Sequence, residues 1–178
     1  MVPNKLESSR LTLVKLNSSF CSQTYVDWMN DIDVFRYLDS GGDYTIQKLR
    51  EYLLETEKRE ILFYAITIKN SNKHIGNIKV DPINLRYGFG EYGIMMGDRS
   101  EWGKGYAKEA TNVIIDFCFN KLKLRKICLG VVEDNEVAVA LYKKLGFEIE
   151  GIYKLHGYYN QKYCNTIRMS LFNRNFKY

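Results

Sequence analysis

Residues 92–110, YGIMMGDRSEWGKGYAKEA, determine how the rest of the chain is interpreted. The apolar residues at their start predict a strand over 87–96, and recurring apolar positions predict a helix over 104–121. Between them, Gly103 and Gly105 lack a Cβ atom, so the backbone can turn tightly and approach a ligand closely. Free N–H groups at a helix start, helped by the helix dipole, favour phosphate. The stretch therefore suits a phosphate-bearing ligand.

This glycine turn matches neither of two common nucleotide-binding motifs. A GxGxxG motif would need a third glycine where Lys108 stands, and the spacing of GxxxxGK[ST] is absent. Lys104 can add positive charge to the turn. Two glycines at this spacing are equally typical of an ordinary strand-to-helix turn, so the turn alone does not decide between the two interpretations.

A second stretch, VEDNEVAVALYKKLGF at residues 132–147, predicts a helix over 135–145. Asn135 can cap its start and Gly146 can end it. Asn135 and Tyr142 are seven residues apart, about two turns, and so share a face. Tyr142 lies at the margin of the apolar stripe, where its phenol could reach a cleft or its ring could simply pack. The stripe itself is expected to contain Val137, Ala138, Leu141 and Leu145.

The remaining sequence predicts a mixed α/β chain. We expect strands over 10–16, 61–69, 75–80, 126–132, 148–156 and 163–172, a helix over 46–59 capped by Thr45, and an earlier helix capped by Ser18 or Ser19. Antiparallel strands come first, and a strand–helix–strand–helix–strand unit closes the chain. That order predicts a mixed, largely antiparallel central sheet with helices on both faces. The length, 178 residues, predicts a single domain over residues 1–178.

Composition and charge narrow the class of protein. With 46% hydrophobic and 26% charged residues, the chain is neither disordered nor membrane-spanning, and the first residues lack an apolar signal core, which predicts a cytoplasmic protein. The net charge of +5 is compatible with an anionic ligand or with a lysine-rich solvated surface, and interspersed acidic residues argue against nucleic-acid binding. Four scattered cysteines and two distant histidines predict neither a disulfide nor a metal site.

The two motifs together, WGKGYAKEA followed by EDNEVAVALYKKLGF, resemble the GNAT superfamily of acetyl-CoA-dependent N-acetyltransferases. The similarity is closest to the branch of ribosomal-protein alanine and spermidine acetyltransferases. It spans nearly the whole chain, from SRLTLVKL to YCNTIRMSLF. One position departs from the common pattern, because Trp102 stands where the superfamily often has Arg or Gln.

The resemblance implies acetyl-CoA as co-substrate, no metal, and a role for each motif residue. Backbone N–H groups of the turn would bind the pyrophosphate, and strand residues would pair with the pantetheine arm. Tyr142 would protonate the leaving thiolate, and Glu91 matches the place where many relatives carry a base, although a solvated strand glutamate is the alternative. The implied cofactor-binding residues are Ile94, Met95, Met96, Gly103, Lys104, Gly105, Tyr106, Ala107 and Asn135.

The acceptor is expected to be a small-molecule amine that attacks the thioester directly in a ternary complex. Residues 24–39, TYVDWMNDIDVFRYLD, resemble acetyltransferases of surface-polysaccharide pathways, which implies a nucleotide-linked amino sugar. Alternatives are a polyamine, for which Asp27, Asp31, Asp33 and Asp39 could supply carboxylates, and a protein N-terminal alanine. An acyl-CoA-binding sensor is the non-enzymatic alternative. Neither nucleic acid nor membrane is an expected partner, and a homodimer is a further candidate assembly.

Overall fold

The computed structural model describes residues 2–177 and contains two compact units. One unit comprises the chain up to Asp81 together with Gly93–Ile114, and the other comprises Pro82–Tyr92 and the chain from Ile115. Strand β5 (Phe89–Met96) and helix α4 (Tyr106–Asn120) contribute residues to both units. Each unit therefore contains part of the strand–turn–helix stretch on which the sequence interpretation depends.

Eight strands form the sheet in the described part of the chain, in the hydrogen-bonded order β1-β2-β3-β4-β5-β6-β8-β7. The parallel pair is β5–β6, whereas β1–β2, β2–β3, β3–β4, β6–β8 and β7–β8 are antiparallel. This confirms the predicted mixed α/β class with a largely antiparallel sheet. The other strands are β1 (Lys5–Glu7), β2 (Leu11–Lys15), β3 (Leu62–Ile68), β4 (Lys73–Asn84), β6 (Lys126–Val132), β7 (Glu148–Tyr159) and β8 (Lys162–Phe172).

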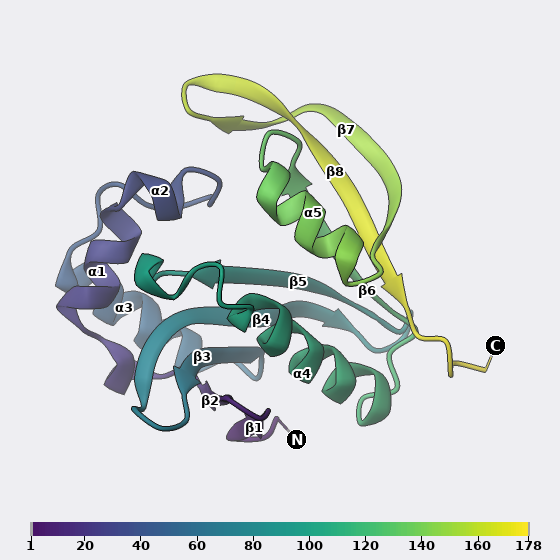
Figure 1. Ribbon diagram of the computed structural model, residues 1–178, viewed down its shortest axis with the longest axis horizontal. Coiled ribbons are helices and arrows are strands. Elements are labelled where there is room, and N and C mark those ends of the chain that lie inside the picture. The colour runs from purple at the N-terminus through teal and green to yellow at the C-terminus, as the bar shows by residue number, and fades with distance from the viewer. Residues whose placement is uncertain (1, 178) are drawn as a thin grey trace. The chain divides into compact units, whose positions relative to one another are not determined.

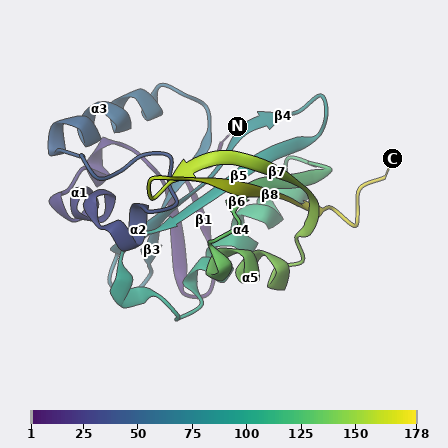
Figure 2. The same ribbon diagram turned by 90° about the horizontal axis from the view of Figure 1, so that it is seen from above.

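In the first unit, β3 is buried on both faces, as its continuous apolar sequence predicts. On one face, Phe63 and Ala65 pack in a cluster with α1 (Gln23–Asn30) and α3 (Ile46–Glu57). Because side chains alternate along a strand, Leu62, Tyr64 and Ile66 point to the other face. Figures 1 and 2 show α3 and the first part of α4 on opposite sides of β3.

In the second unit, α5 (Glu136–Lys144) lies along one face of the strands β5, β6 and β8 (Figure 2). The β6 residues Ile127, Leu129 and Val131 are buried, as expected for a strand in the middle of this sheet. Strand β7 forms the edge of the sheet and is exposed along most of its length. No helix among the described residues is both long and apolar enough to cross a bilayer.

The N-terminal helices differ from the predicted ones in their starts. Helix α1 begins after Ser22, whose hydroxyl accepts the Tyr25 N–H at 3.2 Å, so neither Ser18 nor Ser19 is its cap. Residues Ser18–Phe20 instead form a short 3-10 helix, η1, because the Asn17 side chain accepts the Ser19 N–H and closes a separate turn. A four-residue helix, α2 (Ile32–Phe35), follows α1, and Thr45 caps α3 as predicted. The three-residue strand β1 has no counterpart among the predicted elements.

Candidate functional site

The turn before α4 has the backbone geometry that its glycines predict. A 3-10 helix, η2 (Arg99–Glu101), leads into Gly103 with φ +76° and Gly105 with φ +82°, conformations that favour glycine. A Cβ atom at Gly103 would meet no protein atom within 4 Å, so space is open beside the turn. Helix α4 starts at Tyr106, and its first N–H groups have no partners within the helix. The turn therefore offers backbone donors beside open space, as phosphate binding requires.

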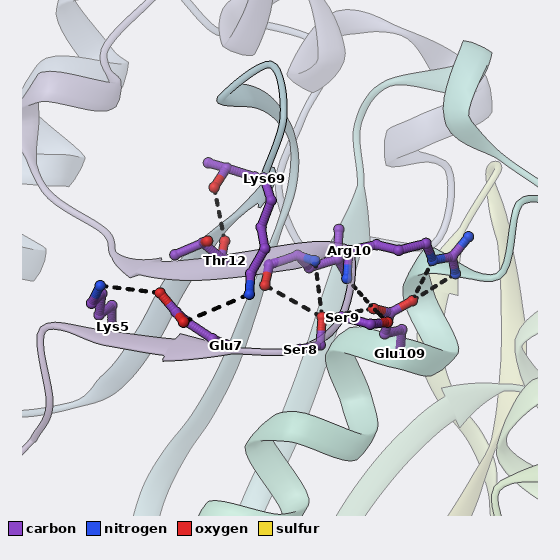
Figure 3. Close-up of polar contacts among 10 residues, drawn as sticks. Lys5, Glu7, Ser8, Ser9, Arg10, Thr12, Lys69 and Glu109 are labelled. Atoms are coloured by element: carbon purple, nitrogen blue, oxygen red, sulfur yellow. Dashed lines mark hydrogen bonds and ion pairs between the residues drawn. The ribbon is translucent and has the colours of Figure 1, made fainter.

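Arg10, which lies outside the predicted motif, and Glu109, which lies within it, hold this turn in place (Figure 3). The Glu109 carboxylate accepts hydrogen bonds from Ser8 Oγ at 2.7 Å, Ser9 Oγ at 3.0 Å and the Arg10 N–H at 2.9 Å. Arg10 Nε lies 2.6 Å from Glu109 Oε2, and Arg10 Nη1 donates to the Lys104 carbonyl at 3.1 Å. The same guanidinium lies 4.5 Å from the centre of the Tyr106 ring. The β1–β2 hairpin is thus joined directly to the turn and to the first helical residue.

The carboxylate of Glu109 is strongly stabilised in its charged form. Partial burial by itself would raise its pKa, but the hydrogen bonds from Ser8, the Arg10 N–H and the Arg10 guanidinium lower the pKa of Glu109 to about 2. Glu109 also lies in the first turn of α4, where the helix dipole favours negative charge.

Lys104 is ion-paired in the structure. Its Nζ lies 2.7 Å from Glu101 Oε2, and Lys73 lies 2.9 Å from the other oxygen of that carboxylate. Hydrogen bonds from Lys104 and Lys73 lower the pKa of Glu101. Because Glu101 offsets the charge of Lys104, the donors that the turn presents are chiefly its backbone N–H groups.

Trp102, the residue that departs from the common pattern, joins the turn to strand β5. Its indole Nε1 donates to the Met96 carbonyl at 2.9 Å, while 42% of the residue is exposed. Gly97, which follows the strand, lies against Trp28 so closely that a Cβ atom there would come within 2.2 Å of the indole. The end of β5, with Ile94, Met95 and Met96, is therefore fixed by two tryptophans in the first unit.

In the second unit, Glu91 and Tyr142 lie on opposite faces of the sheet. The ring of Tyr92 packs edge-on against Tyr142, with ring centres 5.9 Å apart. Successive strand residues point in opposite directions, so Glu91 faces away from Tyr142. Glu91 Oε1 lies 2.5 Å from Nη2 of Arg168, a residue of β8. The parallel pairing of β5 with β6 includes Glu91, which lies opposite Cys128.

The side chain of Tyr142 is buried on the inward face of α5. Its ring contacts Phe147 as well as Tyr92, and burial raises the pKa of Tyr142 to about 12. The predicted core stripe of α5 is wrong at Val137, which is 84% exposed, because the helix turns Tyr142 rather than Val137 inward. Gly146 ends the helix with φ +91°, as predicted.

Asn135 caps α5, as its position predicts. Its side-chain oxygen accepts the Ala138 N–H at 3.3 Å, which leaves the amide nitrogen of that side chain as a donor. Asn135 and Tyr142 both belong to the second unit, whereas the glycine turn belongs to the first. Within residues 2–177, no group of three or more His, Cys, Asp or Glu side chains is arranged to hold a metal ion.

The sequence interpretation missed Arg10, Glu109 and Arg168. Arg10 and Glu109 lie 99 positions apart, and Arg168 lies 77 positions from Glu91, so no local spacing connects them. The signal that was available is the acidic residue in the first helical turn, Glu109, which implies a cationic or donor partner somewhere in the chain.

Comparison with known proteins defines the class. Residues 10–148 match the family model described as an acetyltransferase (GNAT) domain, and this match extends through residues of both units. The chain belongs to the GNAT family of acetyltransferases. It is an N-acetyltransferase of a family that uses acetyl-CoA.

Individual relatives support this assignment. The chain is 29% identical over 154 residues to the uncharacterized N-acetyltransferase p20 of Bacillus licheniformis, covering 83% of this chain and 84% of the relative. It is 35% identical over 97 residues to the spermidine N(1)-acetyltransferase of Escherichia coli K12, covering 54% and 52%.

Solved structures share the fold. The spermidine N-acetyltransferase of Vibrio cholerae in complex with CoA and spermine has a TM-score of 0.84 at 24% identity, covering 95% of this chain and 99% of that one. The ribosomal-protein-S5-alanine acetyltransferase of Vibrio fischeri has a TM-score of 0.79 at 22% identity, covering 98% and 99%.

Proposed function

We propose that this N-acetyltransferase binds acetyl-CoA at the glycine turn and transfers the acetyl group directly to a primary amine in a ternary complex. The turn before α4 carries the proposal, because Gly103 and Gly105 adopt positive φ beside open space at a helix start. Direct transfer owes much of its rate to positioning. Holding the reactants in the correct orientation can lower the activation free energy by about 7–11 kcal/mol.

The proposed cofactor-binding residues have three tasks: they bind the pyrophosphate, bind the pantetheine arm and stabilise the developing oxyanion. In the first unit, backbone N–H groups of residues 103–107 bind the pyrophosphate, and the backbone of residues 94–96 pairs with the pantetheine arm. In the second unit, the Asn135 amide nitrogen is the proposed donor to the cofactor, since its side-chain oxygen is already used in capping. An N–H near Ile94 is the donor proposed for the developing oxyanion.

Tyr142 is the proposed general acid. As the new C–N bond forms and the C–S bond breaks, the phenol gives its proton to the leaving thiolate, and solvent returns a proton to the phenol. A pKa of about 12 keeps the phenol protonated at neutral pH, so the donor is loaded before each turnover. The same burial makes the phenolate costly, which favours its rapid reprotonation.

Glu91 is the proposed base. An attacking ammonium must first lose a proton, and Glu91 accepts it either directly or through a water molecule. Arg168, 2.5 Å away, orients the carboxylate through a charge-assisted hydrogen bond. Since Glu91 faces away from Tyr142, the amine would reach it from the open face of the β5–β6 pair.

A nucleotide-linked amino sugar is the proposed acceptor. The positive net charge and the cationic side chains around Glu91 support an anionic acceptor over a cationic one. The amine of a sugar is also less basic than an alkylamine. Its ammonium form therefore loses a proton more readily, and a weaker base is sufficient.

A polyamine is the alternative, because relatives are named as spermidine acetyltransferases. It would need free carboxylates, yet Asp31 pairs with Arg99, and Asp33 pairs with both Arg99 and Arg36. Asp27 accepts from Gln23. A peptide with an N-terminal alanine is a third candidate, on the fold shared with the ribosomal-protein acetyltransferase.

The test is an acceptor screen that follows release of free thiol from acetyl-CoA. UDP-glucosamine, glucosamine, spermidine and an alanine-initiated peptide are compared at equal concentration. Turnover of the nucleotide sugar above the other three supports the proposal. Preferential acetylation of spermidine or the peptide would replace the acceptor and leave the activity standing. Tight acetyl-CoA binding with no turnover of any amine would favour an acyl-CoA sensor instead.

A further inference from the structure

The second unit has a cavity on the face of the sheet opposite Tyr142. This cavity is open to solvent, has a volume of about 700 Å³ and lies over β5, β6, β7 and β8. Glu91 and Cys128, which are paired across β5 and β6, both line it. The other lining residues are Arg86, Tyr87, Phe89, Arg125, Lys126, Glu150, Gly151, Tyr153 and Arg168. The side chain of the proposed base, Glu91, therefore lines a space that is large enough for a sugar and its substituents.

Cations exceed carboxylates in this cavity, and both carboxylates are paired. Glu91 pairs with Arg168 at 2.5 Å, and Glu150 pairs with Lys126 at 2.8 Å while also accepting from Ser170. The two remaining cations are Arg86 and Arg125. No Asp or Glu among residues 2–177 forms an ion pair with either guanidinium, so two positive charges are left for a ligand.

The two arginines are positioned at the same end of the cavity. The Arg86 guanidinium lies 5.6 Å from the centre of the Tyr87 ring. Arg125 Nε donates to the Tyr87 carbonyl at 3.3 Å, and the Arg125 N–H donates to the Gly88 carbonyl at 2.6 Å. Tyr87 thus contacts both arginines, one through its ring and the other through its backbone.

We infer that Arg86 and Arg125 bind the phosphate of a phosphate-bearing amine acceptor whose amine is presented to Glu91. The inference rests on the proposed function, since it places the acceptor beside the proposed base. Guanidinium groups pair with phosphate through two parallel hydrogen bonds, which a lysine ammonium cannot reproduce. A polyamine would instead meet two uncompensated positive charges here.

The spacing along β6 agrees with such an acceptor. Arg125 precedes Cys128 by three residues, about 10 Å along an extended strand, and Cys128 lies opposite Glu91. That span is comparable with one sugar ring and its glycosidic phosphate. Tyr87 and Tyr153, 57% and 51% exposed, provide aromatic faces on which a sugar or a base can stack.

The binding test uses UDP as the probe, measured by calorimetry with coenzyme A at saturation so that the glycine turn is occupied. Wild type is compared with Arg86→Ala, Arg125→Ala and the double variant, and exposed Arg50→Ala on α3 controls for net charge. Removing either guanidinium should weaken UDP binding about tenfold or more, with Arg50→Ala unchanged. Lysine at both positions should restore only part of the affinity.

Several outcomes of this experiment decide the inference. The inference is overturned if the wild-type protein fails to bind UDP. It is also overturned if a folded double variant binds UDP as tightly as wild type does. Both conclusions hold whether or not the enzyme turns over any amine. Inorganic phosphate that binds as tightly as UDP would show a site for free phosphate and also overturn it.

A kinetic arm separates this inference from the proposed function. The double variant should raise the KM for UDP-glucosamine about tenfold or more, and leave the KM for acetyl-CoA unchanged. An equal rise in KM for glucosamine, which has no phosphate, would contradict recognition through the arginines. Loss of acetyl-CoA turnover in wild type with every acceptor would count against the proposed function, and the UDP affinities would still decide the inference.

Discussion

Arg10 and Glu109 are 99 positions apart in the chain, and the guanidinium Nε lies 2.6 Å from the carboxylate. The same arginine donates to the Lys104 carbonyl, and its Nη2 lies 3.6 Å from the position a Cβ atom would take at Gly105. The conformation of the glycine turn is therefore tied to a residue at the start of β2.

Arg10→Ala should weaken acetyl-CoA binding. The turn would lose its hydrogen bond at Lys104 and the cation over the Tyr106 ring, so its N–H groups would be less well ordered before binding. We expect a loss of about tenfold in affinity by calorimetry, with the KM for the acceptor unchanged. Lys5→Ala, which removes an exposed cation from β1, is the control. Equal affinity in Arg10→Ala and wild type would show that the turn holds its own shape.

Glu109→Gln should lower stability most at neutral pH. The native pKa of about 2 is depressed below the ordinary 4.5, so the charged carboxylate stabilises the fold above about pH 4.5 and loses this effect as pH falls toward 2. The contribution at neutral pH is about 3 kcal/mol from a shift of this size. Urea unfolding from pH 3 to 7 should show the gap between variant and wild type widening with pH. A difference in unfolding free energy that is independent of pH would contradict the lowered pKa of Glu109.

Gly105→Val should abolish tight acetyl-CoA binding in a folded protein. Its φ of +82° is strained for a β-branched residue, and the new side chain would stand where phosphate oxygens approach the turn. Gly88→Ala is the matched control, because Gly88 also has positive φ, +67°, but lies outside the turn. Both variants should lose some thermal stability, and only the variant at Gly105 should lose affinity. Unchanged binding in folded Gly105→Val would remove the turn as the cofactor site.

Tyr142→Phe should lower kcat about 10²–10⁴-fold and leave the KM for acetyl-CoA nearly unchanged, since the ring and its packing remain. A pKa of about 12 also means that deprotonation of Tyr142 does not limit wild-type activity below about pH 11. The variant's pH profile should therefore be lower than that of wild type at every pH but have the same shape. Wild-type kcat in the variant, measured where chemistry limits the rate, would make the tyrosine structural only.

Glu91→Gln should cost less in kcat than Tyr142→Phe if the acceptor is an amino sugar, because that amine needs less help in losing its proton. Its effect should shrink as pH rises and more amine is already neutral. Arg168→Gln keeps the glutamate but removes its cation, and should lower kcat by a smaller factor. A kcat for Glu91→Gln that is wild-type at all pH values would exclude the glutamate as the base.

Local patterns were sufficient for the elements that surround the site. The bounds of β6 were predicted to the residue, and Thr45, Asn135 and Gly146 act as the helix signals they resemble. These features depend on neighbours within a few positions, which a sequence displays directly.

Features that depend on distant partners could not be predicted. The apolar pattern predicts Val137 in the core and Tyr142 at its margin. In the structure Tyr142 is buried and Val137 is exposed, because packing against Tyr92 and Phe147 sets the rotation of α5. The ionic partner of Glu91 is a residue of β8, and its identity follows only from strand order.

The bonding of the β1–β2 hairpin to the turn links ligand binding to the beginning of the chain. A ligand that binds only when the turn is ordered also stabilises the contacts that hold the turn in that conformation. These contacts include the hydrogen bonds from Ser8, Ser9 and Arg10 to Glu109. Saturating coenzyme A should therefore slow amide hydrogen exchange in Leu11–Lys15 as well as around the turn itself. A chain shortened to begin at Leu11 would lose both the affinity and this protection.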